Sequence, residues 1–422
     1  MTIRVESEIG RLKRVLLHRP GREIDWMVPS MMSQLLFDDI LYGEQARAEH
    51  ERFADVLRAA GVETLYVQDL LTEVLETPEA RHELFESFEA GDNLAPGALE
   101  KLEAMSAAEA AEAAIAGLRN PEGYQSTETR LYDLAPVPNY FFQRDPHFLV
   151  GDRIFLSSMA TDARRREPLL SGMVFRHHPR LLCANPIFSV ASGDPSEGYP
   201  MGGDPPQLEG GDVIVANKET LLVGISQRTN RRGVERLAEH LRREPTSFKQ
   251  LILVDLPTQR SYMHLDTVFT IVDEGSCLAF LPVIEPRRRL SAQAFWVDLG
   301  AKHLSFSLRP SLLGAIAEAG LELEPVPCGA SDDVLEQARE QWTDGANAFA
   351  VSPGVILLYR RNRRTLDELS KRGWKVVDEE EVLSGRRQIR HGERTVVTVL
   401  GNELSRARGG PRCMTMPIER EP

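Results

Sequence analysis

Long apolar stretches are missing from this sequence of 422 residues. No run of about 18 consecutive apolar residues occurs, which is the length that a membrane-spanning helix needs. The opening residues MTIRVESEIGRL lack the apolar core of a secretory signal peptide. We therefore expect a cytoplasmic protein with no membrane partner.

Cysteine is scarce, with four residues at Cys183, Cys277, Cys328 and Cys413. None of them forms a C-x-x-C pair, so the spacing excludes a zinc ribbon, and four cysteines in so long a chain do not make a disulfide scaffold. We expect reduced thiols and no structural metal. Cys413 nevertheless stands in an unusual loop, ARGGPRCMTMP, in which two glycines permit uncommon backbone angles and a proline restricts them.

An excess of basic residues is also absent. The chain has 50 Lys and Arg against 63 Asp and Glu, a net charge of -13, and no basic run interleaved with aromatic residues. A nucleic-acid groove needs such a run, so we expect no nucleic-acid partner. Hydrophobic residues make up 42% of the chain, which is enough for a large globular core.

What the sequence does contain is a recurring strand-turn-strand unit. EGGDVIVANKETLLVGISQRTNRRGVERLAEHL predicts two strands around a turn at Asn217-Lys218 and then an amphipathic helix. GANAFAVSPGVILLYRRNRRTLDELSKRG predicts the same order around a turn at residues 353–354, and turns at residues 151–152 and 274–275 mark two further strand pairs. GRLKRVLLHRP could begin a fifth. Such units cannot bury a core singly, so we predict one α/β domain over residues 1–422, with a closed ring protecting the strand edges.

Two segments depart from this plan. Residues 69–117 are rich in Ala, Glu and Leu at helical spacing, which predicts a helical insertion. EEEVLSGRRQIRHGE, residues 379–393, is charged and irregular, and we predict that it is a surface excursion.

Acidic residues recur beside the predicted strands. Asp145 lies in the apolar context YFFQRDPHFLV, Glu209 opens EGGD before a strand, and Asp266 belongs to MHLD, which we expect to open another strand. Each alone is explained as a turn or capping acid. His264 lies two residues from Asp266, and on a strand these two side chains would share one face. A lone histidine is more often structural, but the neighbouring carboxylate favours an acid-base role.

Buried acids imply a cation. The sequence lacks the cysteine and histidine ligands of a soft-metal site and the D-x-D-x-D-G loop of a calcium site. Guanidinium is the other cation that carboxylates hold in a plane, because it offers five N–H donors in a fixed fork. A cysteine thiolate facing its central carbon would act as a nucleophile.

The blocks SEIGRLKRVLLHRPG, LLFDDI, NYFFQRDP, ARRRE, EGGDV, MHLDTVFT and GGPRCMTMPI, in this order, resemble the arginine deiminase family of guanidino-group modifying enzymes. The resemblance covers nearly the whole chain. It implies a pentein fold, an α/β-propeller of five ββαβ-type modules around a pseudo-fivefold axis, with a helical insertion and a central active site. Sequence periodicity alone does not give the number five.

The resemblance also implies catalytic roles. It makes Cys413 the nucleophile and His264 the general acid and base, while Asp145 and Asp266 hold the guanidinium nitrogens and Glu209 supports His264. The implied reaction is hydrolysis of free L-arginine to L-citrulline and ammonia through a thiouronium intermediate on the cysteine. It requires no cofactor.

Five further residues match the family's substrate-binding positions. Asn139 and Phe142 line the pocket, and Arg164, Arg228 and Arg408 engage or gate the α-carboxylate of the substrate. Each arginine alone is explained as a solvated surface charge. An agmatine enzyme has no substrate carboxylate to pair, so the arginines favour free arginine.

Some features of the sequence do not decide which guanidino compound is the substrate. Gln143 stands where many members have threonine, the 379–393 excursion lengthens the approach to the cysteine loop, and Pro411-Arg412 replaces a small or histidine-containing pair. Dimethylarginine hydrolases, agmatine deiminases and amidinotransferases have similar acid, histidine and cysteine sets. A papain-like thiol hydrolase would not need the acids, and a non-catalytic arginine-binding protein would not need the cysteine. Homo-oligomers are possible.

Overall fold

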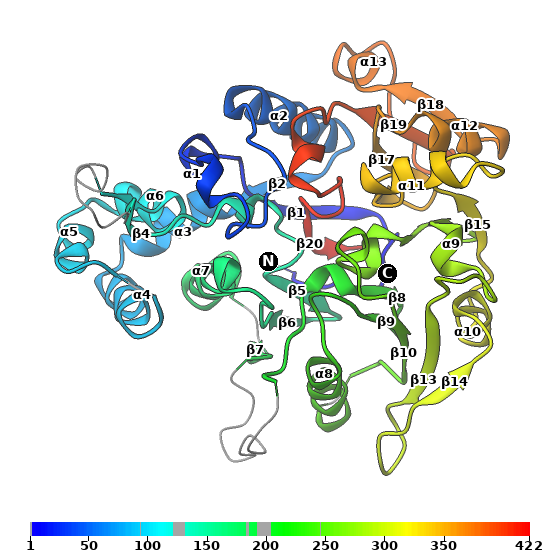
Figure 1. The fold of residues 1–422 in the computed structure, drawn as a ribbon, viewed down its shortest axis with the longest axis horizontal. Coiled ribbons are helices and arrows are strands. Elements are labelled where there is room, and N and C mark those ends of the chain that lie inside the picture. Colours follow the sequence, from blue (N-terminus) through cyan, green and yellow to red (C-terminus); the bar gives the residue numbers. More distant parts are fainter. Residues whose placement is uncertain (1, 93, 121–130, 183–184, 192–203, 245) are drawn as a thin grey trace.

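The computed structural model describes the whole chain except residues 1, 93, 121–130, 183–184, 192–203 and 245. Its strands form five sheets of three or more strands and one two-stranded sheet. The larger sheets surround a common centre, and helices α2, α8, α10 and α12 lie toward the outside (Figure 1). Cys183 lies outside the described residues, whereas Cys277, Cys328 and Cys413 are free thiols.

Each larger sheet repeats one plan, which we call a module. Two strands form an antiparallel pair, and a third strand runs parallel to the second one. In chain order the three strands of the modules are β5 (His147–Val150), β6 (Arg153–Leu156) and β7 (Phe188–Ser189); β8 (Val213–Asn217), β9 (Thr220–Ile225) and β10 (Gln250–Asp255); β11 (Phe269–Asp273), β12 (Ser276–Ala279) and β15 (Glu324–Pro327); β16 (Phe349–Ser352), β17 (Val355–Tyr359) and β19 (Thr395–Val399); and β20 (Met416–Arg420), β1 (Leu12–Leu17) and β2 (Glu63–Tyr66).

The last module joins the two ends of the chain. Strand β20 pairs antiparallel with β1, and β2 runs parallel to β1 on its other side. The four strand pairs predicted around turns are confirmed, and GRLKRVLLHRP does supply a strand of a fifth module. Sequence reasoning could not identify β20 as its partner, because the two segments lie at opposite ends of the chain.

Helices connect the second and third strands of the modules. They are α2 (Gly43–Ala59), α7 (Arg166–His177), α8 (Arg231–Arg243), α9 (Leu281–Ile284) with α10 (Leu312–Glu318), and α12 (Arg363–Lys371). Helix α8 shows why these segments are helical. Its buried residues Val234, Leu237, Ala238 and Leu241 recur at helical spacing, and the Asn230 side chain caps its first turn by accepting from the Gly233 N–H.

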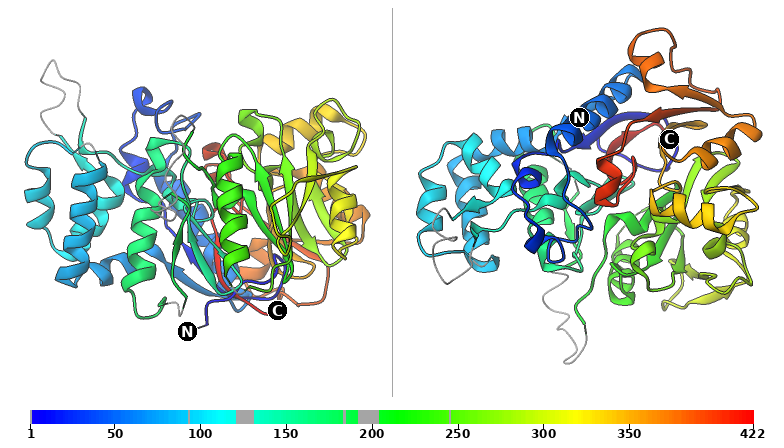
Figure 2. Two further views of the ribbon diagram at one scale, coloured as in Figure 1. Left: turned by 90° about the horizontal axis from the view of Figure 1, so that it is seen from below. Right: turned by 45° about the horizontal axis from the view of Figure 1, so that its top comes forward.

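Additional elements extend this plan. Four helices follow β2 and lie to one side of the sheets (Figure 2): α3 (Val67–Leu75), α4 (Pro78–Gly91), α5 (Ala98–Glu103) and α6 (Ala107–Ala116). Shorter elements are α1 (Arg22–Asp25), the pair β3 (Leu118–Arg119) and β4 (Tyr132–Leu134), the extension β13 (Gln293–Asp298) and β14 (Ser307–Arg309), α11 (Val334–Trp342) and β18 (Lys375–Asp378).

The prediction for residues 379–393 is partly wrong. Its first residues form helix α13 (Glu379–Leu383), which starts with a capping box between Asp378 and Glu381. Glu379 and Val382 are buried, and Glu379 accepts a hydrogen bond from Arg52. The capping pair and this buried acid stabilise a helix that the charge content concealed. The following residues 384–393 are irregular and largely exposed, as predicted.

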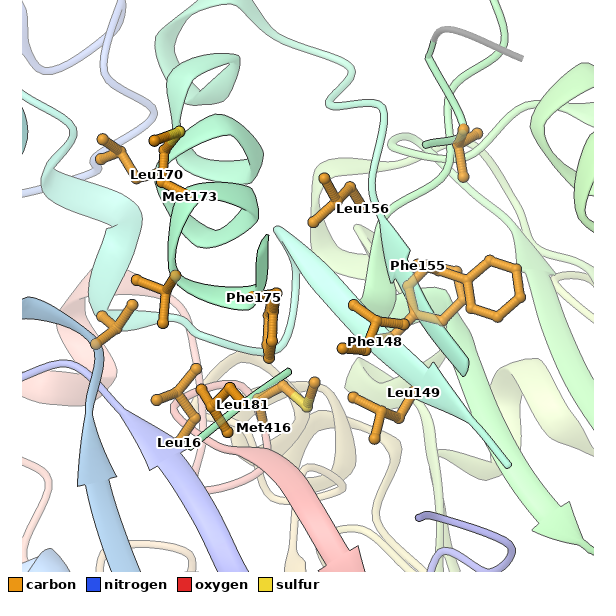
Figure 3. Packing of buried hydrophobic residues seen from close by; sticks show 14 of the residues in the cluster. Leu16, Phe148, Leu149, Phe155, Leu156, Leu170, Met173, Phe175, Leu181 and Met416 are labelled. Atoms are coloured by element: carbon orange, nitrogen blue, oxygen red, sulfur yellow. The ribbon is translucent and has the colours of Figure 1, made fainter. Parts of the chain in front are cut away.

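The apolar core lies between the sheets and their covering helices. In its largest cluster Phe148 stacks on Phe155 with ring centroids 5.1 Å apart, and Phe175 of α7 packs nearby (Figure 3). Leu16 of β1 and Met416 of β20 belong to the same cluster, so the two chain ends are joined by packing as well as by strand pairing. Among the described helices, none has the length and apolarity needed to cross a membrane.

Hydrogen bonds link the modules around the centre. The first strand of each module is preceded by Asp145, Asp212, Asp266, Asn347 or Cys413, one residue per module. The links are from Arg144 N to Cys413 O, from Gly210 N to Asp145 O, from Leu265 N to Asp212 Oδ1, from Asn347 Nδ2 to Asp266 O, and from Cys413 N to Asn347 Oδ1, with lengths of 2.8–3.2 Å. Five equivalent positions thus place polar groups from distant segments at one point.

Candidate active site

A small cavity opens at this central point. Its walls contain eight of the ten site residues expected from the sequence, namely Asn139, Phe142, Asp145, Arg164, Arg228, His264, Arg408 and Cys413. The other two, Glu209 and Asp266, lie directly behind this wall, in contact with His264 and Cys413. The cavity volume is about 20 Å³, which is room for about one water molecule.

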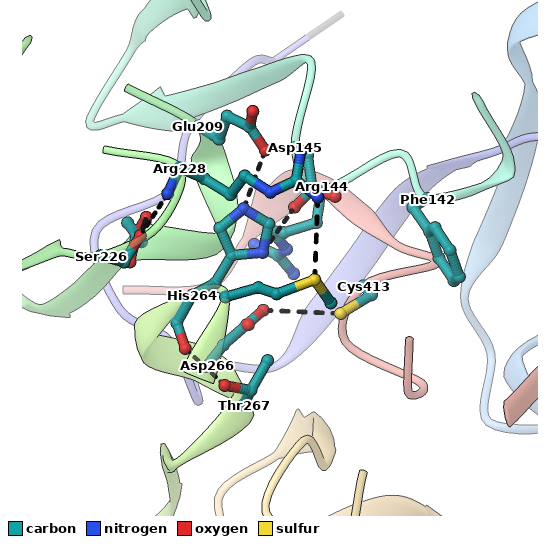
Figure 4. A network of polar contacts seen from close by, with 12 residues as sticks. Phe142, Arg144, Asp145, Glu209, Ser226, Arg228, His264, Asp266, Thr267 and Cys413 are labelled. Atoms are coloured by element: carbon teal, nitrogen blue, oxygen red, sulfur yellow. Dashed lines mark hydrogen bonds and ion pairs between the residues drawn. The ribbon is translucent and has the colours of Figure 1, made fainter. Parts of the chain in front are cut away.

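His264 and Glu209 form a buried pair (Figure 4). His264 Nε2 lies 2.8 Å from Glu209 Oε2, and His264 Nδ1 lies 3.8 Å from Asp145 Oδ1. Burial would lower the pKa of His264, but the charge of Asp145 and the hydrogen bond to Glu209 raise it to about 9. The imidazole is therefore protonated at neutral pH and can act as an acid.

The strand geometry expected for His264 and Asp266 is wrong. Residues Leu265–Thr267 form a 3-10 turn with His264 at its N-cap, and β11 begins only at Phe269. The turn closes when Leu265 N–H donates to the carboxylate of Asp212 and the Thr267 hydroxyl donates to the His264 carbonyl. Both side chains still reach the site, since His264 contacts Glu209 while Asp266 contacts Cys413.

Cys413 lies on the opposite wall. Its Sγ lies 3.8 Å from Asp266 Oδ2, and its backbone N–H donates to Asn347 Oδ1. Burial, followed by the charges of Asp266 and Asp145, raises the pKa of the Cys413 thiol well above its usual value of 9. The thiol is thus neutral until a cation offsets these acids.

Two glycines shape the loop before Cys413. A Cβ on Gly409 would overlap the ring of Phe142, and a Cβ on Gly410 would lie 2.6 Å from Asn347 Oδ1. Each position therefore excludes a side chain because of close approach, and not because of a left-handed backbone. The close contacts fix the loop against the pocket wall.

Arg412 lies beneath the site, fully buried. Its Nη1 donates to Asp266 Oδ2 over 2.8 Å, and its Nε and Nη2 donate to the two oxygens of Glu8. Burial would lower the pKa of Arg412, but Glu8 and Asp266 raise it above its usual range. Arg412, the residue next to Cys413, thus fixes the position of Asp266.

Arg164 lies among the acids. Its Nη1 donates to Asp145 Oδ2 over 2.7 Å, and its Nε and Nη2 donate to the carboxylate of Glu167. Glu167 is fully buried, and burial raises its pKa to about 7 although the charge of Arg164 opposes that shift. The guanidinium of Arg164 therefore holds Asp145, whereas the sequence comparison expects it to face a substrate carboxylate.

Arg228 has weaker partners. Its side chain is buried, yet it donates only to Thr161 Oγ1 over 3.4 Å and to Met263 Sδ over 3.8 Å. No described residue accepts a hydrogen bond from its Nε. Burial would raise the pKa of Glu209, but the hydrogen bond to His264 and the charge of Arg228 lower it, so Arg228 interacts electrostatically with this acid. A buried guanidinium in this state is stabilised by an added anion.

Two acids of the site have oxygens without a donor. Asp145 Oδ1 and Asp266 Oδ1 are buried and accept no hydrogen bond from any described residue. Burying such oxygens without donors is costly, so the pair is suited to a ligand rich in N–H groups. The site thus combines unmet acceptors at the acids with unmet donors at Arg228.

A metal ion is a second possibility for the acids. Asp145, Glu209 and His264 each offer a ligand atom, and these atoms lie within 4.8 Å of one another. However, Arg164 Nη1 already lies 2.7 Å from Asp145 and 3.8 Å from Glu209. A fixed guanidinium therefore supplies positive charge at this position, and His264 carries a proton there.

Several residues at the site were not identified from the sequence. Asn347 precedes the first strand of its module, the position that Asp145 and Cys413 hold in theirs, so the repeat could have indicated it. Glu167 lies three residues after Arg164 in RRRE, which is the spacing of a helical ion pair. No signal in the sequence indicates the pairing of Glu8 with Arg412.

Solved structures of low sequence identity share the fold. The chain superposes on a saxitoxin-pathway amidinotransferase from Microseira wollei with a TM-score of 0.53 and 12% identity, covering 100% of this chain and 98% of that one. A dimethylarginine dimethylaminohydrolase adduct gives a TM-score of 0.50 at 13% identity, covering 96% of this chain and 99% of that one. The predicted pentein fold is thereby confirmed, and the five modules agree with it.

Relatives found by sequence have a higher identity to this chain than these solved structures do. The family model for arginine deiminase matches residues 33–420. A Bacillus cereus arginine deiminase is 37% identical over 99% of this chain and 98% of its own length. For the Mycoplasma capricolum arginine deiminase the identity is 35%, over 99% of this chain and 97% of its own. The family model over residues 33–420 and relatives at 35–37% identity along nearly the whole chain show that it belongs to the arginine deiminase family.

Proposed function

We propose that this protein is an arginine deiminase, which hydrolyses free L-arginine to L-citrulline and ammonia. One observation carries the proposal: buried acceptors without donors at Asp145 and Asp266, and a buried donor without an acceptor at Arg228. A molecule with a guanidinium at one end and a carboxylate at the other satisfies both. Family membership and relatives of that name at 35–37% identity support the same assignment.

Substrate orientation follows from these unmet groups. The Oδ1 atoms of Asp145 and Asp266 accept from the guanidinium nitrogens and hold the planar cation beside Cys413. Arg228 and Arg408 pair with the α-carboxylate, and Asn139 and Phe142 form the wall between the two ends. We assign Arg164 to holding Asp145, because its donors are directed at Asp145 and Glu167.

The bound cation activates the nucleophile. Burial and the charges of Asp266 and Asp145 raise the pKa of the Cys413 thiol in the free protein, and a guanidinium between the two acids offsets their charge. The thiol then releases its proton to solvent, and Sγ attacks the central guanidinium carbon. The tetrahedral adduct carries the former guanidinium nitrogens and a new C–S bond.

His264 completes both halves of the reaction. As imidazolium, supported by Glu209, it donates a proton to the leaving nitrogen, and the C–N bond breaks to release ammonia. The resulting thiouronium intermediate is attacked by water, whose proton His264 accepts. The C–S bond then breaks while the hydroxyl proton of the adduct passes to the departing sulfur, which returns Cys413 as the neutral thiol and releases citrulline.

A product assay tests this function. Purified protein with L-arginine should form citrulline and ammonia in equal amounts, and Cys413→Ala should show no turnover while remaining folded. Mass spectrometry of acid-quenched wild-type protein should find a substrate adduct on Cys413. Turnover near the wild-type level in Cys413→Ala would refute the covalent mechanism.

A substrate panel separates this function from those of related enzymes. An agmatine deiminase would prefer agmatine, and a dimethylarginine hydrolase would prefer dimethylarginine. An amidinotransferase would need arginine together with an amine acceptor. We expect arginine alone to give the highest kcat/KM. A preference for any other member of the panel would move the assignment to that class.

The proposal also covers the domain organisation, the location and the partners of the enzyme. We infer a single catalytic domain over residues 1–422, with residues 69–117 as a helical insertion in it, acting in the cytoplasm on a small-molecule substrate. The acidic net charge of -13 supports the absence of a nucleic-acid partner. Association into homo-oligomers stays a prediction.

A further inference from the structure

The cavity is too small for the proposed substrate. A volume of about 20 Å³ holds one water molecule, whereas arginine has twelve non-hydrogen atoms. Part of the wall must therefore move when substrate enters. Two wall residues, Leu36 and Arg408, have left-handed backbone angles, each with φ of 69°, which a non-glycine residue adopts at a cost.

Arg408 is held by contacts outside the cavity. Its guanidinium lies over the ring of Trp342, 3.4 Å from the ring centroid, and its Nη1 donates to the Trp342 carbonyl over 2.9 Å. The indole is 41% exposed, so the stacked pair lies at the rim of the pocket. A cation over an indole face is favourable, and it is stronger where water is partly excluded.

The same contact leaves two polar groups unsatisfied. Arg408 Nε and Asp344 Oδ2 are both buried, and neither has a hydrogen-bond partner among the described residues. Burial raises the pKa of Asp344 to about 7, and the charge of Arg408 is the largest influence opposing that shift. Asp344 thus attracts Arg408, but the Nε of Arg408 has no hydrogen-bond acceptor there. This is expected of a side chain that adopts a second conformation when substrate binds.

We propose that Trp342 and Asp344 form a dock that holds Arg408 off the substrate, so that both are positioning residues for the arginine that binds the α-carboxylate. The inference rests on the proposed function. Arginine binding draws Arg408 from the indole to the carboxylate, and the dock competes with the substrate for this one side chain. Its strength therefore sets part of the apparent KM.

Removal of the indole tests the dock. In Trp342→Leu the docked position loses its cation–π contact, so the KM for arginine should fall by about 2- to 30-fold. Agmatine has no carboxylate for Arg408, so its KM as substrate, or its Ki as inhibitor, should stay unchanged. Trp342→Phe keeps an aromatic face, so its KM for arginine should lie between those of wild type and Trp342→Leu. Trp296→Leu removes another stacked Trp–Arg pair, with Arg309, and serves as the matched control.

A purely structural role predicts a different result. Damage to the pocket would raise the KM for arginine and change the value for agmatine as well, and either result would overturn the proposal. An unchanged KM for arginine would do the same. Asp344→Asn provides a second variant should Trp342→Leu fail to fold, and it should also lower the KM for arginine alone.

Tryptophan fluorescence supplies an independent readout. In Cys413→Ala, which cannot turn over, arginine should change the emission because Arg408 leaves Trp342. The change should be absent in Cys413→Ala/Trp342→Phe, with arginine binding verified by calorimetry. An equal change in both proteins would refute the dock. Failure of wild type to form citrulline would instead refute the proposed function, so the two failures are distinguishable.

Discussion

Arg412 and Asp266 share a hydrogen bond of 2.8 Å beside Cys413, and both side chains are fully buried. The oxygen that accepts it, Asp266 Oδ2, is also the atom that lies 3.8 Å from Cys413 Sγ. Glu8 neutralises the other side of Arg412. Asp266, which we propose binds the guanidinium of the substrate, is therefore fixed by a charge network that connects residue 8 to residue 412.

Breaking this network should destabilise the fold. Arg412→Met leaves Glu8 and Asp266 buried without a cation, and we expect the free energy of unfolding to fall by about 3–5 kcal/mol. Chemical denaturation measures it. Arg47→Met, which breaks an exposed pair with Asp25, is the matched control and should cost at most about 1 kcal/mol. Equal losses in the two variants would contradict this account.

The activity should depend on the protonation of His264. Its pKa is raised to about 9 in the folded protein, so the stability that this proton contributes is fully present below about pH 6.5 and is lost as pH rises through about 9. In the proposed mechanism the imidazolium is the general acid, so kcat/KM should decline over the same alkaline range. A pH profile of kcat/KM checks this.

Glu209→Gln should shift that profile. The variant removes one cause of the raised pKa of His264, so the alkaline decline should move to lower pH. NMR titration of the imidazole gives the same pKa without turnover. An alkaline limb that stays in place in Glu209→Gln would show that another group controls it.

Arg164 and Arg228 should respond differently to removal. Arg228→Ala should lower kcat/KM for arginine by about a hundredfold or more, with little effect on agmatine, because only arginine has the carboxylate. Arg164→Ala releases Asp145 and should impair both substrates alike. The ratio of the two specificity constants in each variant is the measurement. A selective loss for arginine in Arg164→Ala would restore its expected role at the carboxylate.

Gly211 lies against the side chains of His264 and Asp145. A Cβ there would lie 2.7 Å from His264 Cγ and 2.8 Å from Asp145 Oδ1. Gly211→Ala should therefore displace the imidazole from Asp145 and reduce kcat at least tenfold, measured by citrulline formation. Gly91→Ala is the control, since a Cβ at Gly91 meets no described atom within 4 Å. Wild-type kcat in Gly211→Ala would show that the site tolerates the shift.

Sequence reasoning predicted the local elements well and the long-range pairings poorly. The turns at 151–152, 217–218, 274–275 and 353–354 were correct because alternating apolar residues and turn residues lie next to each other in the chain. The 3-10 turn at His264 was missed, because it depends on the Asp212 carboxylate of another module. Helix α13 was missed because its capping box and buried Glu379 are hidden in a charged run.

The site was predicted as a set of residues, but not as an arrangement. Family motifs identified the ten side chains, and eight of them line one cavity. The direction of Arg164 toward Asp145 and Glu167, and the stacking of Arg408 on Trp342, depend on packing between segments that no local pattern encodes. The pairing of Glu8 with Arg412 is the extreme case.

The arrangement of the fifth module affects chains whose synthesis is interrupted or that a protease has shortened. Its strand β20 follows directly after Cys413, and it pairs with β1 near the other end of the chain. During synthesis the four other modules emerge before either the thiol or the strand that closes the ring. An interrupted chain, or one trimmed by a protease before residue 413, therefore lacks nucleophile and closure together. We therefore expect incomplete copies to be inactive and to expose the unpaired edge of β1.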